Sequence, residues 1–233
     1  MYDVAIVGAG ITGSEAALAC ARAGRDVLLV TTSLDTLYNF VGDGAVLEPP
    51  PDTLMADIYD EVAEDGFVGT WACHRHAKYV LEHQPGIHLL QSSVSSLLVS
   101  DGEVKGVRTW EGVDRFAKRT ALCVGSFLEA RLKVGELTEV AGRLSEMAYD
   151  DLFESLRALG FTFEEVTLEA DLQNGSLPYT VNCKRLAPAE RGGGFELTRL
   201  TNLYAAGVCA SGYLSYEDAA DEGKRLASSI CKS

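Results

Sequence analysis

The N-terminal part of the chain alternates between short apolar runs and a segment with helical spacing. Val4 to Val7 has the length of a buried strand, and Ser14 to Ala23 combines small apolar and polar residues before Gly24. A second apolar run, Val27 to Val30, follows at once. Strand-sized runs separated by a helical segment are typical of a strand–helix–strand unit with parallel strands. We therefore expect the chain to begin an α/β fold.

Two further helices are predicted after this unit. A helix capped by Asp52 is expected to run to about Asp65, and another from about Trp71 to Gln84. The segment between Thr36 and Pro51 is rich in glycine and proline and is interpreted as a long loop near the site, because long loops in compact domains are often functional.

From Ile87 onward the pattern changes to that of an antiparallel meander. A hairpin is predicted to turn at Asp101-Gly102, and a third strand from about Asp114 to Arg119 extends it. Ala121 to Val124 is interpreted as a further apolar strand that ends in Gly125-Ser126. Small residues in this position suit a strand whose carboxyl end faces a cofactor.

The C-terminal part combines a helix, a strand-rich segment and a closing strand–glycine–helix unit. The helix is predicted to end at Gly160, and several short strands are expected between Phe161 and Arg199. Asn202 to Ala206 predicts a buried strand that runs into Gly207. The last helix is expected over Tyr216 to Ile230, where Ser215 and Asp218 form the start of a capped helix.

The segment Gly8-Ala9-Gly10-Ile11-Thr12-Gly13 stands between the first predicted strand and the first predicted helix. Gly8 permits a tight turn, Gly10 lets the backbone approach a pyrophosphate, and Gly13 lets the helix lie close to the sheet. The N-terminus of that helix presents free N–H groups to the phosphates. The motif therefore predicts a dinucleotide site. The glycines at 192–194 are interpreted as a flexible turn, because no helix is predicted after them.

Composition limits the partners and the location. The net charge of −14 disfavours nucleic-acid binding, because affinity for phosphates comes largely from Lys and Arg. The apolar runs are too short for a membrane helix, and Met1 leads straight into the first strand, so we expect a cytoplasmic protein that does not bind a membrane. The six cysteines form no Cys-x-x-Cys pair, and we expect reduced thiols and no metal site.

A chain of 233 residues with 47% hydrophobic content suits one domain. We expect an α/β, FAD/NAD(P)-binding Rossmann-like fold with a central parallel sheet and an inserted antiparallel β-meander. Its Rossmann core would cover 1–160 and 198–233, with a small inserted segment at 161–197. An ordinary NAD domain continues with further strand–helix units, whereas this chain inserts a meander and closes with strand, glycine and helix. That plan is the one of an FAD-binding flavoprotein.

Four segments, taken in order, resemble the GidA/MnmG family, flavoproteins that help install a carboxymethylaminomethyl-type group on the wobble uridine of tRNA. The segments are YDVAIVGAGITGSEAALACARAGRDVLLVTTSLDTL, LEHQPGIHLLQSSVSSLLVSDGEVKGVRTW, ALCVGSFLEARLKVG and NLYAAGVCASGYLSYEDAADEG. The resemblance implies bound FAD. It also implies the contacts: Thr31, Thr32 and Ser33 at the adenosine ribose, Val94 at adenine, Gly125 and Ser126 near the adenosine-pyrophosphate side, and Gly207, Val208 and the helix start at Tyr216 by the flavin. Asp35 is a rival ribose ligand, since an acid is expected about 20 residues past the glycines.

Two departures from the family pattern bear on function. A cysteine-containing segment of the family is replaced by Tyr38 to Gly44, which has no cysteine. The larger inserted domain and the C-terminal helical domain, which serves tRNA and partner binding in the full-length family, have no counterpart. We therefore expect this chain alone to bind tRNA weakly or not at all. Cys209 is either a redox thiol that faces the flavin or a small core residue.

The leading hypothesis is an FAD-dependent oxidoreductase related to tRNA wobble-uridine modification, with no catalytic residue identified and with NAD(P)H as a candidate reductant. The alternative is a non-catalytic flavin-binding subunit or regulator that acts with a protein partner, and self-association into a homo-oligomer is also open. An NAD(P)-dependent dehydrogenase without flavin fits only the first 37 residues.

Overall fold

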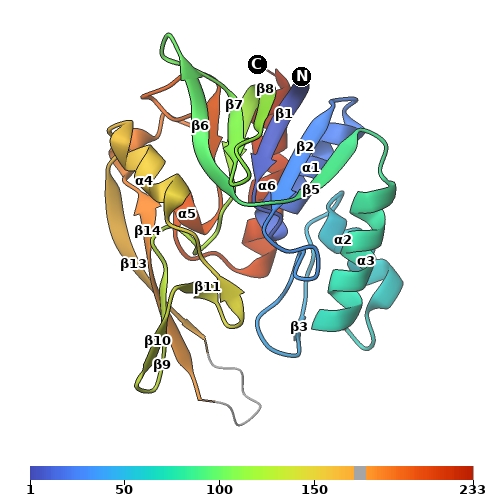
Figure 1. Cartoon of the computed structure of the whole chain (residues 1–233). Helices are drawn as coiled ribbons and strands as arrows, with labels where there is room; N and C mark the ends of the chain where they lie inside the picture. The colour runs from blue at the N-terminus through green and yellow to red at the C-terminus, as the bar shows by residue number, and fades with distance from the viewer. Residues whose placement is uncertain (171–176, 233) are drawn as a thin grey trace.

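A seven-stranded sheet forms the centre of the molecule. The computed structural model describes residues 1–170 and 177–232 (Figure 1). The strand order is β5-β2-β1-β8-β7-β6, and β15 also pairs with β8. Strands β5, β2, β1, β8 and β15 run parallel to their neighbours, whereas β8, β7 and β6 form an antiparallel meander. The α/β fold with a mostly parallel sheet and an inserted meander is confirmed. The strands are β1 (Tyr2–Val7), β2 (Val27–Thr31), β5 (Ile87–Gln91), β6 (Val94–Ser100), β7 (Glu103–Thr109), β8 (Asp114–Leu122) and β15 (Leu203–Ala205).

Strand β8 belongs to both parts of this sheet. The sequence predicts two strands here, with a break near Thr120, and that prediction was wrong. The first residues of β8 pair with β7, as Phe116 does with Gly106, and its last residues pair with β15. Along its other edge β8 pairs with β1 from Ala117 to Leu122. The change from polar to apolar residues within β8 therefore marks the point where the strand enters the buried parallel sheet.

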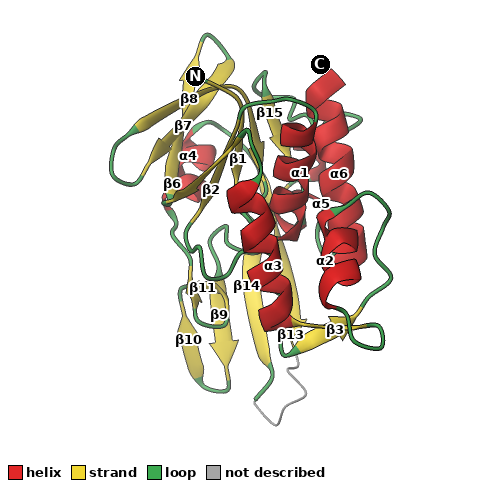
Figure 2. Cartoon of the chain, turned by 90° about the vertical axis from the view of Figure 1, so that its right-hand side faces the viewer, coloured by secondary structure: helices red, strands yellow, loops and turns green. Residues whose placement is uncertain are grey.

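Four helices cover one face of the sheet and a fifth lies on the opposite face (Figure 2). Helices α1 and α6 pack so closely that a Cβ on Gly223 of α6 would lie 2.4 Å from the carbonyl oxygen of Thr12. Within the described parts of the chain, no helix has the length and apolar character to cross a membrane. The four helices are α1 (Ile11–Arg22), α2 (Leu54–Val62), α3 (Thr70–His83) and α6 (Tyr216–Lys232), and the fifth is α4 (Asp151–Ala158).

Of the two predicted helix caps, the one at α6 is confirmed and the one at α2 was wrong. Ser215 caps α6, because its hydroxyl oxygen accepts a hydrogen bond from the Asp218 N–H at 3.0 Å. Thr53 caps α2, its hydroxyl oxygen accepting from the Ala56 N–H at 3.1 Å. Asp52 has a positive φ of 55° and its exposed carboxylate lies 3.3 Å from Lys224.

A second, four-stranded sheet lies beside the first, with order β10-β9-β14-β13. Strands β13 (Phe163–Ala170) and β14 (Tyr179–Leu186) come from the predicted inserted segment, and β9 (Arg131–Val134) and β10 (Leu137–Glu139) precede it. The division of the chain into a core and an insert at 161–197 stays a prediction. Two small two-stranded sheets complete the fold: β3 (Gly44–Val46) with β4 (Phe67–Gly69), which α2 separates along the chain, and the hairpin of β11 (Ala141–Arg143) with β12 (Glu146–Met147).

Candidate dinucleotide-binding site

A cavity lies at the carboxyl ends of β1, β2 and β8. Its walls are the turn after β1, the residues that follow β2, the β5–β6 connection, the segment after β8 and the β11–β12 hairpin. Strand β1 stands between β2 and β8, and the chain crosses from one side of β1 to the other. In open α/β sheets, ligands bind at the carboxyl ends of the strands at such a reversal of strand order. The cavity is therefore in the place where this class of fold binds a ligand.

Two of the three motif glycines are required by the protein's own structure. Gly8 has a φ of 103°, and a Cβ on it would lie 2.3 Å from the carbonyl oxygen of Cys123. A Cβ on Gly13 would lie 1.9 Å from the carbonyl oxygen of Gly8. Both distances are far below van der Waals contact. The predicted roles of Gly8 in the tight turn and of Gly13 in the close approach of the helix are confirmed.

Gly10 differs from both of these glycines. Its φ of −69° and ψ of −171° are open to any residue, and no described atom lies within 4 Å of a Cβ built on it. Gly10 lines the cavity and forms the N-cap of α1 without a side-chain hydrogen bond. Neither the backbone nor the packing of the described residues thus requires glycine at this position.

The N-terminus of α1 is electrostatically suited to an anion. The first turn of this fully described helix has no acidic residue. Aligned peptide dipoles and unpaired N–H groups make such a helix end attractive to phosphate. Glu15, one turn further along, is buried and directed elsewhere: its carboxylate accepts hydrogen bonds from the N–H groups of Leu54 at 2.7 Å and Met55 at 2.8 Å. Burial raises the pKa of Glu15, and the Tyr38 hydroxyl also donates to it.

Glu15 connects two other segments to the loop Gly8 to Gly13, called the phosphate loop below after its predicted ligand. The sequence did not predict this role. Its carboxylate caps the N-terminus of α2 and binds Tyr38, whose own N–H donates to the carbonyl oxygen of Ala9 at 3.0 Å. The loop after β2 is therefore held against Gly8 to Gly10. An acid in a helix is ordinarily interpreted as a solvated residue, and the packing of α2 and α6 onto α1 buries this one.

The structure places the predicted site residues in two groups. Those that line the cavity come from both the adenosine and the phosphate predictions: Gly8, Ala9, Gly10, Thr31, Thr32, Val94 and Gly125. The others lie outside the lining: Ile11, Thr12, Gly13, Ser33, Ser126, Gly207, Val208 and Tyr216. Asp35, the rival ribose ligand, is also outside it; its carboxylate is exposed and lies 3.5 Å from the Lys78 ammonium group.

Gly207 and Val208 lie beside the phosphate loop. Gly207 has a φ of 77° and precedes the short helix α5 (Val208–Ser211), which the sequence analysis missed. A Cβ on Gly207 would lie 3.3 Å from the Thr12 hydroxyl oxygen. The Gly207 N–H donates to the carboxylate of Glu222 at 2.8 Å, and so does the Ser211 hydroxyl. Glu222 thus fixes the turn that joins β15 to α5.

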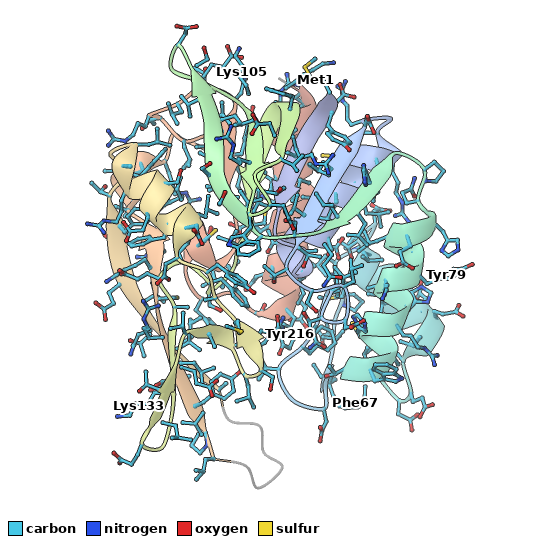
Figure 3. All side chains as sticks on the ribbon, viewed as in Figure 1. Met1, Phe67, Tyr79, Lys105, Lys133 and Tyr216 are labelled. Carbon is cyan, nitrogen blue, oxygen red and sulfur yellow. The ribbon has the colours of Figure 1, made fainter. Side chains whose placement is uncertain are left out.

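Tyr216 stands at the start of α6, on the side of the molecule that Figure 3 shows. Its ring stacks on that of Phe40, with centroids 4.6 Å apart, and its hydroxyl oxygen accepts from the Val41 N–H at 2.8 Å. The first turn of α6 therefore faces the loop after β2. A contact between this helix and a flavin stays a prediction.

Cys209 is buried, with 1% of its surface exposed. Its thiol lies 3.3 Å from the carbonyl oxygen of Ala206 and 3.5 Å from that of Leu122. Burial raises the pKa of this thiol to about 12. A buried thiol with a high pKa is a poor nucleophile. These observations favour a small core residue over a redox thiol.

Six polar residues of the cavity wall were absent from the predicted site: Thr36, Ser92, Ser93, Arg143, Glu146 and Tyr149. The Arg143 guanidinium lies 2.6 Å from the Glu146 carboxylate and donates to the carbonyl oxygen of Asn39 at 2.8 Å. The Thr36 hydroxyl donates to Glu146 at 3.1 Å. Thr36, Arg143 and Glu146 lie in a short irregular hairpin and in a loop, where no hydrophobic periodicity points to a site.

The fold and this cavity define a Rossmann-like α/β protein with a dinucleotide-type phosphate loop. A model of the family described as Glucose inhibited division protein A matches residues 3–72 and 68–168. The chain therefore belongs to the GidA family.

The relatives agree with this assignment. The tRNA uridine 5-carboxymethylaminomethyl modification enzyme MnmG of Chlamydia caviae is 31% identical over 186 residues, which are 69% of this chain and 30% of that protein. The chain thus spans less than a third of the length of the curated relatives that it matches. The GidA-related protein from Thermus thermophilus is 40% identical with a TM-score of 0.89, and 99% of this chain and 98% of that chain are covered. Aquifex aeolicus GidA shares the fold, with a TM-score of 0.87 at 16% identity over 99% of this chain and 63% of that one.

Proposed function

We propose that this protein binds FAD without a covalent link and serves as a flavin-dependent oxidoreductase. In this proposal the pyrophosphate lies on Gly8 to Gly10 at the N-terminus of α1. The adenosine lies between Thr31-Thr32 and the β5–β6 connection at Val94. The observation that carries the proposal is the open space at Gly10.

Gly10 is the one motif glycine that the described residues do not require to be glycine. Gly8 and Gly13 would clash with the protein's own backbone if they had a Cβ. Gly10 would clash with no described atom, yet it lines the cavity at a helix N-terminus. A glycine that the protein's own packing does not require fits a site where a ligand approaches the backbone closely. A pyrophosphate is the group that such a helix end favours.

Membership in the GidA family supports FAD as the dinucleotide and a link to tRNA wobble-uridine modification. Bound FAD would supply hydride or electron transfer, while the chain would supply binding and orientation. NAD(P)H is the proposed reductant. Because a net charge of −14 repels the phosphates of RNA, we propose that the chain acts on tRNA only together with a partner.

A second candidate function is that of a flavin-holding subunit without chemistry of its own. Among the described residues of the cavity wall, Arg143 and Glu146 are the charged side chains, and they pair with each other. Cys123 also lines the cavity, but burial raises the pKa of its thiol well above the usual value. The charged groups of the described wall thus pair with each other, and neither is placed as a general acid or base.

The experiment is to purify the full chain, record its visible spectrum, release the ligand by heat and identify it by chromatography. FAD in near-stoichiometric amount is the expected result, and well-folded protein that takes up no FAD even when it is supplied would contradict the proposal. Anaerobic addition of NADH then separates the two candidates. Bleaching of the flavin absorbance supports the oxidoreductase, and an unchanged spectrum supports the flavin-holding subunit.

A further inference from the structure

The β11–β12 hairpin forms the wall of the cavity that faces the phosphate loop. Arg143, Glu146 and Met147 of this hairpin line the same cavity as Gly8 to Gly10. The hairpin comes from a part of the chain remote from the glycine motif, and Figure 1 shows it below the ends of the central strands, between the main sheet and the second sheet. A ligand in the cavity would therefore lie between the hairpin and the phosphate loop.

One side of the hairpin is fixed to the segment after β8. The Ser126 hydroxyl donates to the carbonyl oxygen of Gly142 at 2.6 Å. A Cβ on Gly142 would lie 2.5 Å from the ring of Phe127, so the backbone of the hairpin rests directly on this ring. Ala141 and Ala148, at the two ends of the hairpin, are buried in the core of the second sheet. This side combines apolar packing with a backbone contact.

The other side meets the loop after β2 through polar contacts, next to Val41 of that loop, which packs against the core of the second sheet. Arg143 donates to the carbonyl oxygen of Asn39 at 2.8 Å, and Thr36 donates to Glu146 at 3.1 Å. The Arg143–Glu146 pair, 2.6 Å apart, joins the two contacts, and its side chains are 20% and 13% exposed. We call Arg143, Glu146, Thr36 and the Asn39 carbonyl the latch.

The tip of the hairpin is largely exposed, and the Leu144 N–H donates to the hydroxyl oxygen of Tyr179 on β14. Leu144 is 41% exposed and Met147 is 66% exposed. Ser145 has a positive φ of 63°, as in a tight turn. A two-stranded ribbon is marginally stable by itself in water, so tertiary contacts must hold it. The two hydrogen bonds of the latch, from Arg143 to Asn39 and from Thr36 to Glu146, each involve a charged group and are therefore stronger than neutral ones.

We propose that the latch gates the cavity, so that the adenosine half of the bound dinucleotide enters and leaves only when the contacts between the hairpin and the loop after β2 are broken. This inference rests on the proposed function, because it takes FAD as the ligand. It assigns Arg143, Glu146 and Thr36 as positioning residues. The anchored side at Gly142 is the hinge, and the latched side opens.

A gate and an ordinary ligand contact differ in their kinetics. Loss of a contact speeds dissociation and leaves association unchanged, whereas loss of a latch speeds passage in both directions. We expect Arg143→Met to raise both rate constants by roughly tenfold, the factor for one charge-assisted hydrogen bond, with a smaller change in Kd. Thr36→Val, which removes only the hydroxyl donor, should raise both by a smaller factor. Arg143→Lys, which keeps the charge near Glu146, should restore part of the slow behaviour.

The measurement is stopped-flow FAD binding to the apo form of the full chain, followed by flavin fluorescence, with release measured after rapid dilution of the holo form. Arg157→Met is the matched control, because Arg157 forms an exposed pair with Glu154 on α4 and neither side chain lines the cavity. Unchanged association rates in Arg143→Met and Thr36→Val, with FAD still bound, would overturn the latch alone. Failure of the wild type to bind FAD would overturn the latch together with the proposed function.

Hydrogen exchange of the wild type tests the same idea without a variant. Bound FAD should slow amide exchange in residues 141–147 and in the loop at 36–39, because a filled cavity supports the latch from within. Strand β13, remote from the cavity lining, serves as the internal reference. Equal exchange in both segments with and without bound FAD would contradict a gate at this hairpin.

Discussion

Replacement of Gly10 by alanine should abolish or weaken FAD binding and leave the apo protein as stable as the wild type. The added Cβ meets no described atom within 4 Å, so it causes no clash in the empty cavity. It would occupy the space that we assign to the pyrophosphate. The same change at Gly13 is the matched control, because its Cβ would lie 1.9 Å from the carbonyl oxygen of Gly8.

The expected magnitudes follow from these distances. Alanine is a poorer N-cap than glycine by about 0.5–1 kcal/mol, and it stabilises by about 0.4–1 kcal/mol through the unfolded state, so the net change for Gly10→Ala is near zero. Gly13→Ala overpacks a backbone contact, which costs about 1–3 kcal/mol or more. FAD at 100 times its Kd stabilises the wild type by about 2.7 kcal/mol. A tenfold rise in Kd lowers that stabilisation in Gly10→Ala to about 1.4 kcal/mol.

The assay is urea unfolding of the two variants and the wild type, followed by far-UV circular dichroism, with and without FAD at one fixed concentration. The free energy of unfolding without FAD reports the packing, and the increment caused by FAD reports the binding. Two results would refute the reasoning. One is a full FAD increment in Gly10→Ala, and the other is a loss of more than about 2 kcal/mol in its apo form, which would contradict near-neutral packing at this position.

Three further predictions concern stability, thiols and RNA. Hydrogen bonds from Arg199 hold the pKa of Glu190 below its ordinary 4.5. The ionised carboxylate therefore stabilises the fold above about that pH, and this contribution is lost as the pH falls through the lowered pKa. In Glu190→Gln the urea midpoint should fall less between pH 5 and 3 than in the wild type, and an equal fall in both proteins would contradict this. Iodoacetamide should label the half-buried Cys231 of the native protein first and leave the buried Cys209 unlabelled, as peptide mass spectrometry can show. Early labelling of Cys209 would restore it as a redox candidate. In filter binding at about 150 mM salt the chain alone should show no submicromolar affinity for tRNA, and such affinity would mean that a local basic surface outweighs the net charge of −14.

The order of residues within short segments was enough to predict the first strand–helix–strand unit and the phosphate loop. Glycine placement between a strand and a helix depends on backbone conformation and close approach, which neighbouring residues dictate. The turn at Gly8 and the start of α1 therefore follow from the sequence. The cap at Ser215 follows for the same reason, because a side chain bonds to a backbone group three residues away.

Contacts between distant segments were decided only by the tertiary structure. The division at Thr120 was predicted from polarity, but hydrogen bonds from β1 carry β8 through that point. Asp52 is a good N-cap by residue type, yet its φ of 55° is not the extended conformation of an N-cap, and Thr53 stands at the helix start instead.

The cavity wall shows the same division most clearly. Thr31, Thr32 and Val94 could be predicted as site residues because they end or begin strands in a known unit, and the structure brings them to one cavity. Thr36, Arg143 and Glu146 carry no signal of their own, since a polar residue in a loop or short hairpin is ordinary. Their positions depend on Glu15 and Tyr38 holding the loop after β2 and on Phe127 supporting Gly142. Side chains more than one hundred residues apart meet there because the sheet places their loops at one edge, and periodicity within a single segment cannot encode that meeting.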